Sequence, residues 1–450
     1  MMLEQTRWFG RYLLAVLLAV AGCIAPDRAG AGRAAGSETA APVPPAEGAV
    51  ATGRWRNLFV ERGHPEAKVT AKIQKAWDKL FHGDPDQQAV YFPKGSNANG
   101  PLGYLMDIGN GDVRSEGMSY GMMVAVQTGH KAEFDALWNW AKTYMAHPEP
   151  KHPAHGYFAW QMKPNGEVMD PNPAPDGEEY FITALYFAHA RWGSGQGIYD
   201  YRAEADRLLS DVRNRGDIAG RDANGRDYTL GSLFNREHKM VRFTPDLADY
   251  AKNGDHTDPS YHLPAFYEVW ARVGPAAEAD FWRAAAKVSR DFLAKAAHPT
   301  TGLVPDYAEF DGRPKPREGN PGGGDFRYDA WRAAMNWSVD YAWWAADPRA
   351  IKRSDRLQAF FEKQGLGSYV NRYHLDGRPI GNDHSPGLVA TNAVASLAAS
   401  DARAWRFVDE LWRAEVPRGT WRYYDGMLYL MSLLHVSGQF RAYLPSDVTP

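Results

Sequence analysis

The 450-residue chain has a single cysteine and a net charge close to zero. One cysteine, Cys23, excludes a disulfide within the chain and a metal site built from thiolates. A net charge of −3 provides no electrostatic attraction to nucleic acid. The sequence also lacks an H-E-x-x-H motif, a P-loop and a G-x-S-x-G elbow. We therefore expect no metal, no cofactor and no nucleic-acid partner.

The N-terminus has no apolar run long enough to span a bilayer, but it has the features of an export signal. Arg7 and Arg11 precede the run LLAVLLAV, which leads into AGC. The stretch VAGC (residues 20–23) resembles a bacterial lipobox and predicts a lipoprotein-type signal peptide at 1–22, with lipidation of Cys23. The alternative is an ordinary secretory signal with an incidental cysteine.

Both interpretations predict an exported protein. A lipidated Cys23 places it on the cell envelope, at the periplasmic side or the outer membrane, with the lipid as its only membrane contact. Residues 23–53 are rich in Ala, Gly and Pro and predict a flexible tether. Residues 54–445 contain no second linker of this kind and predict a single domain.

The domain shows helical periodicity. In residues 66–81, for example, Val69, Ile73 and Leu80 fall on one helix face. Runs of alternating β-branched residues are scarce. The predicted helices are 66–81, 117–128, 132–145, 178–192, 201–212, 262–273, 278–296, 329–345, 354–364, 387–399, 402–412 and 424–436. A dozen helices predict an all-α fold of helical hairpins, closed as an (α/α)6 barrel or stacked as a solenoid, and the absence of a fixed repeat disfavours the solenoid.

Aromatic residues make up 13% of the chain. Trp and Tyr combine large flat faces with polar tips, so they suit an aromatic-rich core and also a groove on which flat ligands stack. Composition leaves both interpretations open.

The stretch DVRSEGMSYGMM (residues 112–123) places Glu116 at the start of an apolar helix. Ser115 is a candidate N-cap, and Glu116 could simply stabilise the helix dipole. However, Gly117, Tyr120 and Gly121 follow it, and small residues allow another group to approach the backbone closely. A carboxyl group held among Met and Tyr would have a raised pKa, as a general acid requires.

A second candidate carboxylate is Asp176 in PAPDGEEYF, just before Glu178 and Glu179. Three acids within four residues repel one another unless one faces a ligand or a cation. N-capping by Asp176 is the alternative role.

The third candidate is Asp329 in FRYDAWRAAMNW, flanked by Arg327 and Arg332. A carboxylate near arginine stays ionised, as a base that deprotonates water requires. The alternative is a surface ion pair at the helix start. Glu116 and Asp329 form a pair with contrasting surroundings, which is typical of an acid and a base. Paired acids among aromatic-lined loops favour a polysaccharide ligand.

The blocks DVRSEGMSYGMM, GYFAWQ, APDGEEYF, DPSYHLP and YDAWR, in this order, resemble glycoside hydrolase family 8 from about Trp55 to Tyr443. The resemblance implies an (α/α)6 barrel that hydrolyses β-1,4 glycans with inversion. It implies that Glu116 is the general acid and Asp329 the general base. The substrate-binding residues that it implies are Asp176 at the distorted sugar, Tyr261 at the attacking water, Arg332 beside the base, Trp160 as a stacking platform, Tyr120 with the two glycines around the sugar ring, and His384.

Within the family, the sequence is most similar to exo-oligoxylanases that release xylose from the reducing end. Those enzymes close one side of the substrate site with a Leu-His-Pro loop, and here His384 lies between Asp383 and Ser385. We expect a monomer that cleaves xylo-oligosaccharides. An endo-β-1,4-xylanase or endo-β-1,4-glucanase is the alternative.

Overall fold

The computed structural model describes residues 40–221, 227–317 and 319–445, which belong to one structural unit. The predicted signal peptide, residues 1–22, and the predicted lipidation site Cys23 lie outside the described residues. Within the described ranges, no helix is both long and apolar enough to cross a bilayer.

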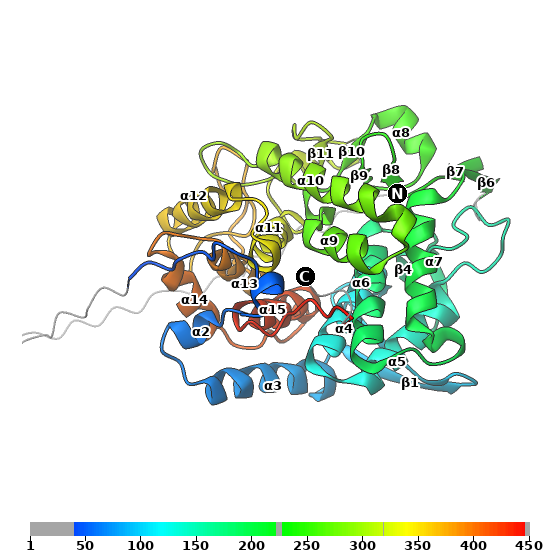
Figure 1. Cartoon of the computed structure of the whole chain (residues 1–450), viewed down its shortest axis with the longest axis horizontal. Coiled ribbons are helices and arrows are strands. Elements are labelled where there is room, and N and C mark those ends of the chain that lie inside the picture. The colour runs from blue at the N-terminus through cyan, green and yellow to red at the C-terminus, as the bar shows by residue number, and fades with distance from the viewer. Residues whose placement is uncertain (1–39, 222–226, 318, 446–450) are drawn as a thin grey trace, which may run out of the picture. The chain divides into compact units, whose positions relative to one another are not determined.

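All twelve predicted helices are present, with ends that differ by a few residues from those predicted. Six of them form a closed inner ring, in which each helix contacts the next and the last contacts the first (Figure 1). In ring order they are α4 (Ser115–Thr128), α6 (Pro175–Trp192), α9 (Pro264–Val273), α11 (Ala330–Trp344), α13 (Pro386–Val394) and α15 (Arg422–Val436). The ring confirms the (α/α)6 barrel.

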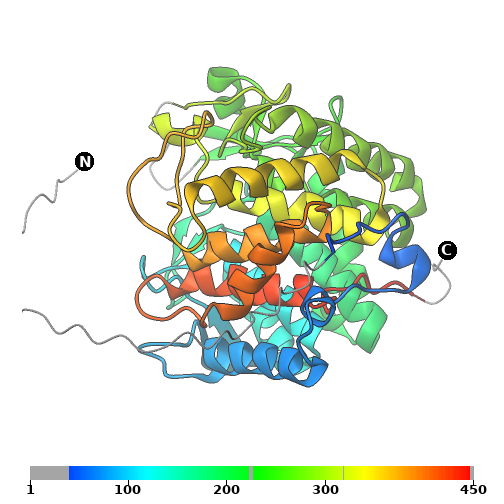
Figure 2. The same cartoon turned by 90° about the vertical axis from the view of Figure 1, so that its left-hand side faces the viewer.

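The other six helices form an outer layer, each packed against one inner helix, and Figure 2 shows several of these helices lying side by side. They are α3 (Glu66–His82), α5 (Lys131–Trp140), α7 (Tyr201–Asn214), α10 (Ala279–Ala296), α12 (Arg349–Gln364) and α14 (Ala404–Arg413). Short helices are α1 (Ala49–Thr52), α2 (Leu58–Glu61) and α8 (Leu247–Asn253), and a π-helical turn, Ala141–Met145, continues α5.

The sequence pattern decides which helices lie inside. Outer helices bury one face, as α14 does with Trp405, Val408 and Leu411. Inner helices are apolar or small on every side, and α4 buries twelve of its fourteen residues. A helix that is apolar all round must be surrounded by protein, so α4 belongs to the ring.

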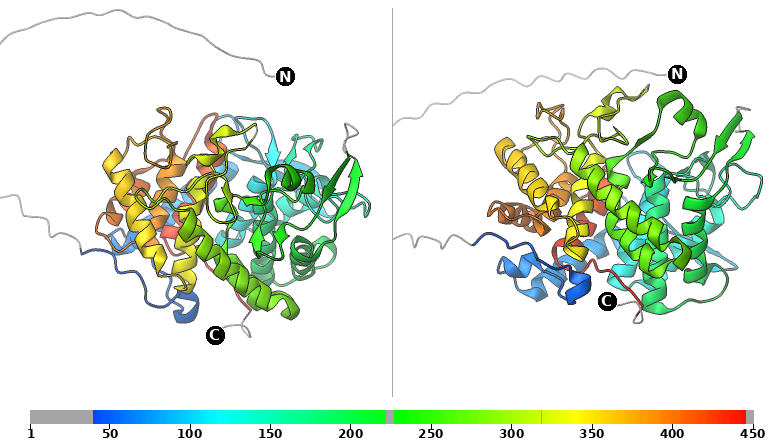
Figure 3. Two further views of the ribbon diagram at one scale, coloured as in Figure 1. Left: turned by 90° about the horizontal axis from the view of Figure 1, so that it is seen from above. Right: turned by 45° about the horizontal axis from the view of Figure 1, so that its top comes forward.

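The N-terminal ends of the inner helices meet at one end of the barrel. Arg332, in the first turn of α11, contacts the first turns of α4 and α6 and the 3₁₀ turn Pro259–Tyr261 that precedes α9. In the first turn of α15, Asp425 accepts a hydrogen bond from Gly387 N at the start of α13 (2.9 Å). Connecting loops gather at this end, away from α1 (Figure 3).

The strands are short and lie in the connections between helices. The longest pair, β1 (Tyr91–Asn97) and β2 (Gly100–Leu105), forms an antiparallel hairpin that the helical periodicity did not predict. The remaining strands are β3 (Val113–Arg114), β4 (Gln161–Met162), β5 (Val168–Asp170), β6 (Ile218–Arg221), β7 (Asp227–Leu230), β8 (Phe234–Asn235), β9 (Met240–Val241), β10 (His256–Thr257) and β11 (Ala308–Glu309). Strands β3, β4 and β5 form a small sheet whose first strand leads directly into α4.

Residues 40–53 are not a free tether, contrary to the prediction from composition. Trp405 Nε1 donates to the carbonyl oxygen of Ala40 (2.8 Å), and Tyr341 OH donates to that of Pro45 (2.8 Å). Gly48 lies so close to α11 that a Cβ there would come within 2.1 Å of the Trp343 carbonyl oxygen. Figure 1 shows this segment running across the inner helices, at the barrel end opposite to the helix N-termini.

This packing predicts a cost of truncation. A chain that begins at Trp55 loses the two hydrogen bonds from Trp405 and Tyr341, each worth about 1 kcal/mol, and uncovers the end of α11. We expect its melting temperature to fall by several degrees relative to a chain that begins at Ala40, measured by circular dichroism. Equal melting temperatures would show that residues 40–53 contribute nothing to stability.

Candidate active site

A single buried arginine, Arg332, joins the predicted site residues. Its side chain is 2% exposed, and its Nη1 lies 3.1 Å from Glu116 Oε2 and 2.7 Å from Asp176 Oδ2. Its Nη2 lies 2.9 Å from Asp329 Oδ1. The structure therefore brings together the three carboxylates that were singled out separately in the sequence. Nη1 also hydrogen-bonds the Tyr120 hydroxyl, and Nη2 donates to Ser260 Oγ (2.9 Å).

Glu116 lies in the first turn of α4, inside the protein. Burial raises its pKa to about 7; Arg332 opposes this shift, whereas Asp176 and Asp329 add to it. Tyr423, in the first turn of α15, donates its hydroxyl to Glu116 Oε1 (3.0 Å). The helix that carries Glu116 has no cationic side chain, but Arg332 reaches Glu116 from another helix 216 residues away in the sequence. The raised pKa persists because burial outweighs that ion pair.

The glycines of α4 make room for side chains of the protein itself. A Cβ on Gly117 would lie 2.4 Å from the Tyr423 hydroxyl, and one on Gly121 would lie 2.0 Å from Leu105 Cδ1. Gly117 thus allows Tyr423 to reach Glu116, so the interpretation of the two glycines as clearance for a sugar ring is wrong. The predicted cap is also wrong: Ser115 is the first residue of α4, and its buried hydroxyl has no hydrogen-bond partner.

The three acids at the start of α6 have separate partners. Asp176 is paired with Arg332 and does not cap the helix, whose N-cap is Ala174. Burial raises the pKa of Asp176, against the effect of Arg332. Glu178 Oε1 accepts from Phe158 N (3.1 Å), and burial raises its pKa to about 8. Glu179 accepts from the Tyr267 hydroxyl (2.5 Å).

Asp329 immediately precedes α11 and is more accessible than the other two carboxylates, with a side chain 31% exposed. Its partner Arg332 is buried, so the pair is not a surface ion pair. Arg327 lies beside a different acid, Asp306 (Nε to Oδ2, 3.5 Å). Tyr328 has φ of 27°, which is strained for a bulky residue, and such strain often occurs at functional sites.

Tyr261 lies beside the carboxylates. Burial raises its pKa, and the carboxylates Asp176, Asp258 and Asp329 add to this effect. The Tyr267 hydroxyl lies 3.2 Å from the Tyr261 carbonyl oxygen and so fixes its backbone. The Arg332 guanidinium lies 5.9 Å from the Tyr261 ring, so Tyr261 belongs to the same cluster.

Trp160 lies beside the start of α4, and His384 lies in the loop that precedes α13. The Trp160 carbonyl accepts from Ser115 N (3.0 Å), and the Arg114 guanidinium lies 5.7 Å from the Trp160 ring. His384 is exposed, and its Nδ1 lies 2.6 Å from the Tyr369 carbonyl oxygen. Its loop adjoins the start of α13, which is tied to α15 by Asp425.

Sequence reasoning missed Tyr423 and Ser260, which contact Glu116 and Arg332. The run WRYYDGM at the start of α15 resembles the other aromatic, acidic and glycine-containing helix starts, so the criterion that found Glu116 could also have found Tyr423. Ser260 carried no comparable signal, because a serine beside a proline is typical of any turn.

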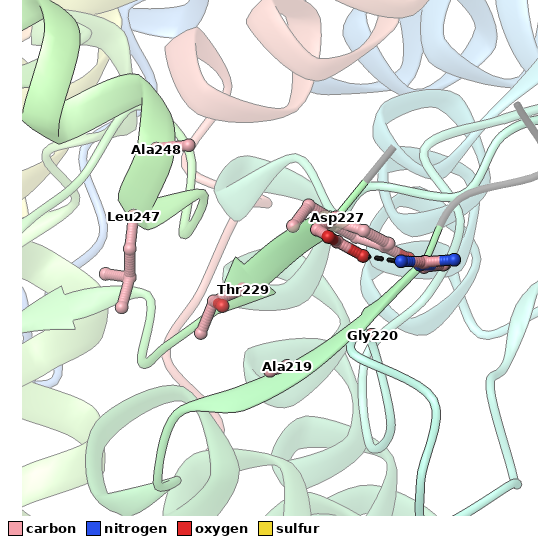
Figure 4. A pocket seen from close by; sticks show the side chains of 8 residues that line it. Ala219, Gly220, Asp227, Thr229, Leu247 and Ala248 are labelled. Carbon is pink, nitrogen blue, oxygen red and sulfur yellow. Dashed lines mark hydrogen bonds and ion pairs between the residues drawn. The ribbon is translucent and has the colours of Figure 1, made fainter. Parts of the chain in front are cut away.

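A separate hollow lies away from these carboxylates, between the β6–β7 hairpin and α8 (Figure 4). Its lining includes Ala219, Gly220, Thr229 and Leu247, with the surface ion pair of Arg221 and Asp227 at its rim. Of the titratable residues in its lining, Tyr228 is buried, whereas Arg221 and Asp227 are exposed.

The chain is similar to known proteins both in sequence and in structure. The sequence model of the family described as Glycosyl hydrolases family 8 matches residues 105–223 and 239–438. The reducing-end xylose-releasing exo-oligoxylanase Rex8A of Paenibacillus barcinonensis is 42% identical over 402 residues, which cover 88% of this chain and 99% of that protein.

Two solved structures from Teredinibacter turnerae are similar throughout. A GH8 xylobiose complex is 56% identical, with a TM-score of 0.86 over 88% of this chain and 100% of the other. A xylohexaose complex of a GH8 catalytic-mutant xylanase is 55% identical, with the same TM-score and coverage. An (α/α)6 barrel with clustered carboxyl groups and these relatives define a glycoside hydrolase. The chain belongs to glycoside hydrolase family 8.

The pKa of Glu116 predicts the pH dependence of catalysis. The resemblance implies that Glu116 is the general acid, which must be protonated, so we expect kcat/KM to fall about tenfold per pH unit above pH about 7. The Tyr423 hydroxyl hydrogen-bonds the carboxylate and favours its ionised form, so Tyr423→Phe should raise this pKa and move the basic limb to higher pH. A pH profile of kcat/KM for both proteins measures the shift. If the basic limb of Y423F lies at the same pH as that of the wild type, Tyr423 does not influence the pKa of Glu116.

Proposed function

We propose that the protein hydrolyses β-1,4-linked xylo-oligosaccharides by single displacement, with inversion at the anomeric carbon. Glu116 donates a proton to the glycosidic oxygen as the C1–O bond breaks. Asp329 accepts a proton from a water molecule whose oxygen attacks C1 from the opposite face. The observation that carries the proposal is the set of contacts at Arg332. One guanidinium contacts both Glu116, whose pKa is about 7, and the more accessible carboxylate of Asp329.

We infer inversion from the resemblance to family 8. Inverting enzymes leave room for a water between carboxyl groups about 6.5–9.5 Å apart. Glu116 and Asp329 contact different nitrogens of Arg332, which keeps both carboxyl groups at one site. In the proposed reaction, Asp176 bonds the hydroxyls of the sugar at the bond that is cut, and Tyr261 orients the water.

Replacement of either catalytic carboxyl tests these roles. Glu116→Gln and Asp329→Asn keep the size of each side chain but remove the proton transfer, so we expect kcat to fall by roughly 10²–10⁴-fold. Hydrolysis of xylotetraose, followed by ¹H NMR of the anomeric protons, measures the rate and shows whether the α-anomer is released first. Substantial activity in D329N, or initial release of the β-anomer, would refute the assignment. Glu268→Gln serves as a matched control, because Glu268 pairs with Arg272 and Arg290 rather than with Arg332.

The finer proposal is that xylose is released from the reducing end. Support comes from Rex8A of P. barcinonensis and two further curated relatives with the same activity in their names, 40% and 36% identical to this chain. His384 occupies the position before Gly-Leu-Val-Ala-Thr-Asn at which, by resemblance, such enzymes close the substrate site.

A second candidate is internal cleavage of xylan, and two observations favour it. The neighbours of His384 are Asp383 and Ser385 rather than Leu and Pro, and its loop is exposed. The T. turnerae xylanase, more similar to this chain than Rex8A, is a xylohexaose complex.

Product analysis decides between the two modes. Reducing-end release predicts xylose plus xylotriose as the first products of xylotetraose and no shortening of long xylan. If the loop controls this choice, Asp383→Leu with Ser385→Pro should increase the share of xylose among first products several-fold, measured by chromatography. If the wild type releases xylobiose from xylotetraose and the double variant releases the same share of it, residues other than Asp383 and Ser385 determine internal cleavage.

We further propose that the protein is exported and anchored through Cys23, on the basis of the VAGC stretch alone. Treatment of an expressing bacterium with globomycin should cause unprocessed precursor to accumulate. Normal processing would instead favour an ordinary secretory signal.

A further inference from the structure

The proposed base, Asp329, follows a residue with a strained backbone. Tyr328 has φ of 27°, a conformation that bulky side chains rarely adopt. Such a residue persists only where the surrounding contacts hold it. The contacts that hold this turn therefore also fix the backbone from which the Asp329 side chain extends.

A second carboxyl group, that of Asp306, contacts the chain on both sides of Asp329. Asp306 lies in the connection between α10 and α11 and is 3% exposed. Its Oδ1 accepts from Ala330 N (3.4 Å), and its Oδ2 lies 3.5 Å from Arg327 Nε. Asp329 occupies the N-cap position of α11, yet its own side chain caps none of the described helix N–H groups. Asp306 thus binds the start of α11 and leaves the Asp329 side chain to other contacts.

The turn is fixed on its other sides as well. Arg327 Nη1 donates to Asn320 Oδ1 (3.2 Å), and a Cβ on Gly322 would overlap the same nitrogen. Glycine at position 322 therefore leaves room for the guanidinium that faces Asp306. From α15, the Tyr424 hydroxyl donates to the Tyr328 carbonyl oxygen (3.1 Å). These contacts, together with those of Asp306, hold the strained residue in place.

The charge of Asp306 indicates which substitution copies it. Burial raises the pKa of Asp306 well above its usual value; Asp329 and Asp258 add to this shift, and Arg327 opposes it. These surroundings favour the uncharged carboxyl group, whose carbonyl oxygen still accepts a hydrogen bond. Asparagine has the same shape and the same acceptor oxygen, so it is the conservative replacement.

We propose that Asp306 is a positioning residue for the base. It holds the turn 327–330 so that Asp329 Oδ1 stays 2.9 Å from Arg332 Nη2 while the side chain, 31% exposed, remains open to the attacking water. A shift of about 1 Å in a reacting group can lower the rate about 100-fold. The inference rests on the proposed hydrolysis of xylo-oligosaccharides and adds a residue that acts through Asp329, without contact to the sugar.

Two substrates distinguish an effect on the base from an effect on the acid. Hydrolysis of xylotetraose requires a proton from Glu116 for the leaving sugar and transfer of a water proton to Asp329. In β-xylobiosyl fluoride, the C–F bond breaks and fluoride leaves with the electron pair, without a proton. The water oxygen still bonds to C1 and still gives its proton to Asp329. Glu116→Gln should therefore lose activity on xylotetraose alone, whereas Asp329→Asn should lose activity on both substrates.

Asp306→Ala should follow the pattern of the base variant. We expect its kcat to fall about 10–100-fold on both substrates, with KM changed less than about twofold, because the base is displaced and the sugar contacts remain. Asp306→Asn should restore kcat to about half of the wild-type value or more, because its amide oxygen accepts from Ala330 N.

Asp347 provides a matched control. It is also 3% exposed, and it accepts from Arg349 N (3.1 Å) at the start of the outer helix α12. Asp347→Ala removes a comparable buried acceptor away from Asp329, so it should lower the melting temperature and leave kcat unchanged on both substrates. Melting temperatures of all variants identify any loss that comes from misfolding.

Three results would overturn the positioning role: a loss in D306A confined to xylotetraose, an unchanged kcat in D306A, or equal losses in D306A and D306N. If D306A does not fold, Arg327→Met removes the second contact of the same carboxyl group. A lower kcat on both substrates in R327M then supports the role, and a wild-type kcat on both refutes it. A wild-type enzyme that hydrolyses neither substrate would instead refute the proposed function.

Discussion

The site depends on one buried guanidinium that is shared by three carboxyl groups. Arg332 carries a single positive charge, so it cannot neutralise Glu116, Asp176 and Asp329 together. Burial raises the pKa of Glu116 to about 7 and also raises that of Asp176, so both carboxyl groups hold a proton more firmly than they would in water. The three side chains differ in exposure around their common cation, from 4% for Asp176 and 14% for Glu116 to 31% for Asp329. Removal of that cation would leave buried charges unpaired, at a cost of about 3–5 kcal/mol.

The barrel makes this sharing possible because it brings the N-termini of its inner helices to one end. Each helix contributes a first turn whose backbone N–H groups and dipole favour negative charge, which partly offsets the crowding of carboxylates. The connecting loops at the same end add Trp160, Tyr261 and the His384 loop. A rigid ring thus fixes the reacting groups, and the loops determine how a long substrate is held.

The sequence allowed all twelve barrel helices to be predicted, since their apolar periodicity is strong and local. It also predicted Glu116, Asp176 and Asp329 as special, because acids at helix starts beside aromatic and glycine residues are visible in short stretches. Contacts across the barrel could not be predicted in this way. The Arg332–Glu116 pair joins residues 216 positions apart, and the contact between Asp306 and Ala330 depends on two segments that meet only after folding. The low apolar content of residues 40–53 suggested a tether because their attachment uses backbone carbonyls, which composition does not reveal.

The attachment of residues 40–53 also has a practical consequence. This segment crosses the barrel end opposite to the carboxylates, so whatever is joined ahead of Ala40 leaves the domain on the face remote from Glu116. Immobilisation of the enzyme on a bead through its N-terminus would leave the end that carries Glu116, Asp176 and Asp329 open to solvent.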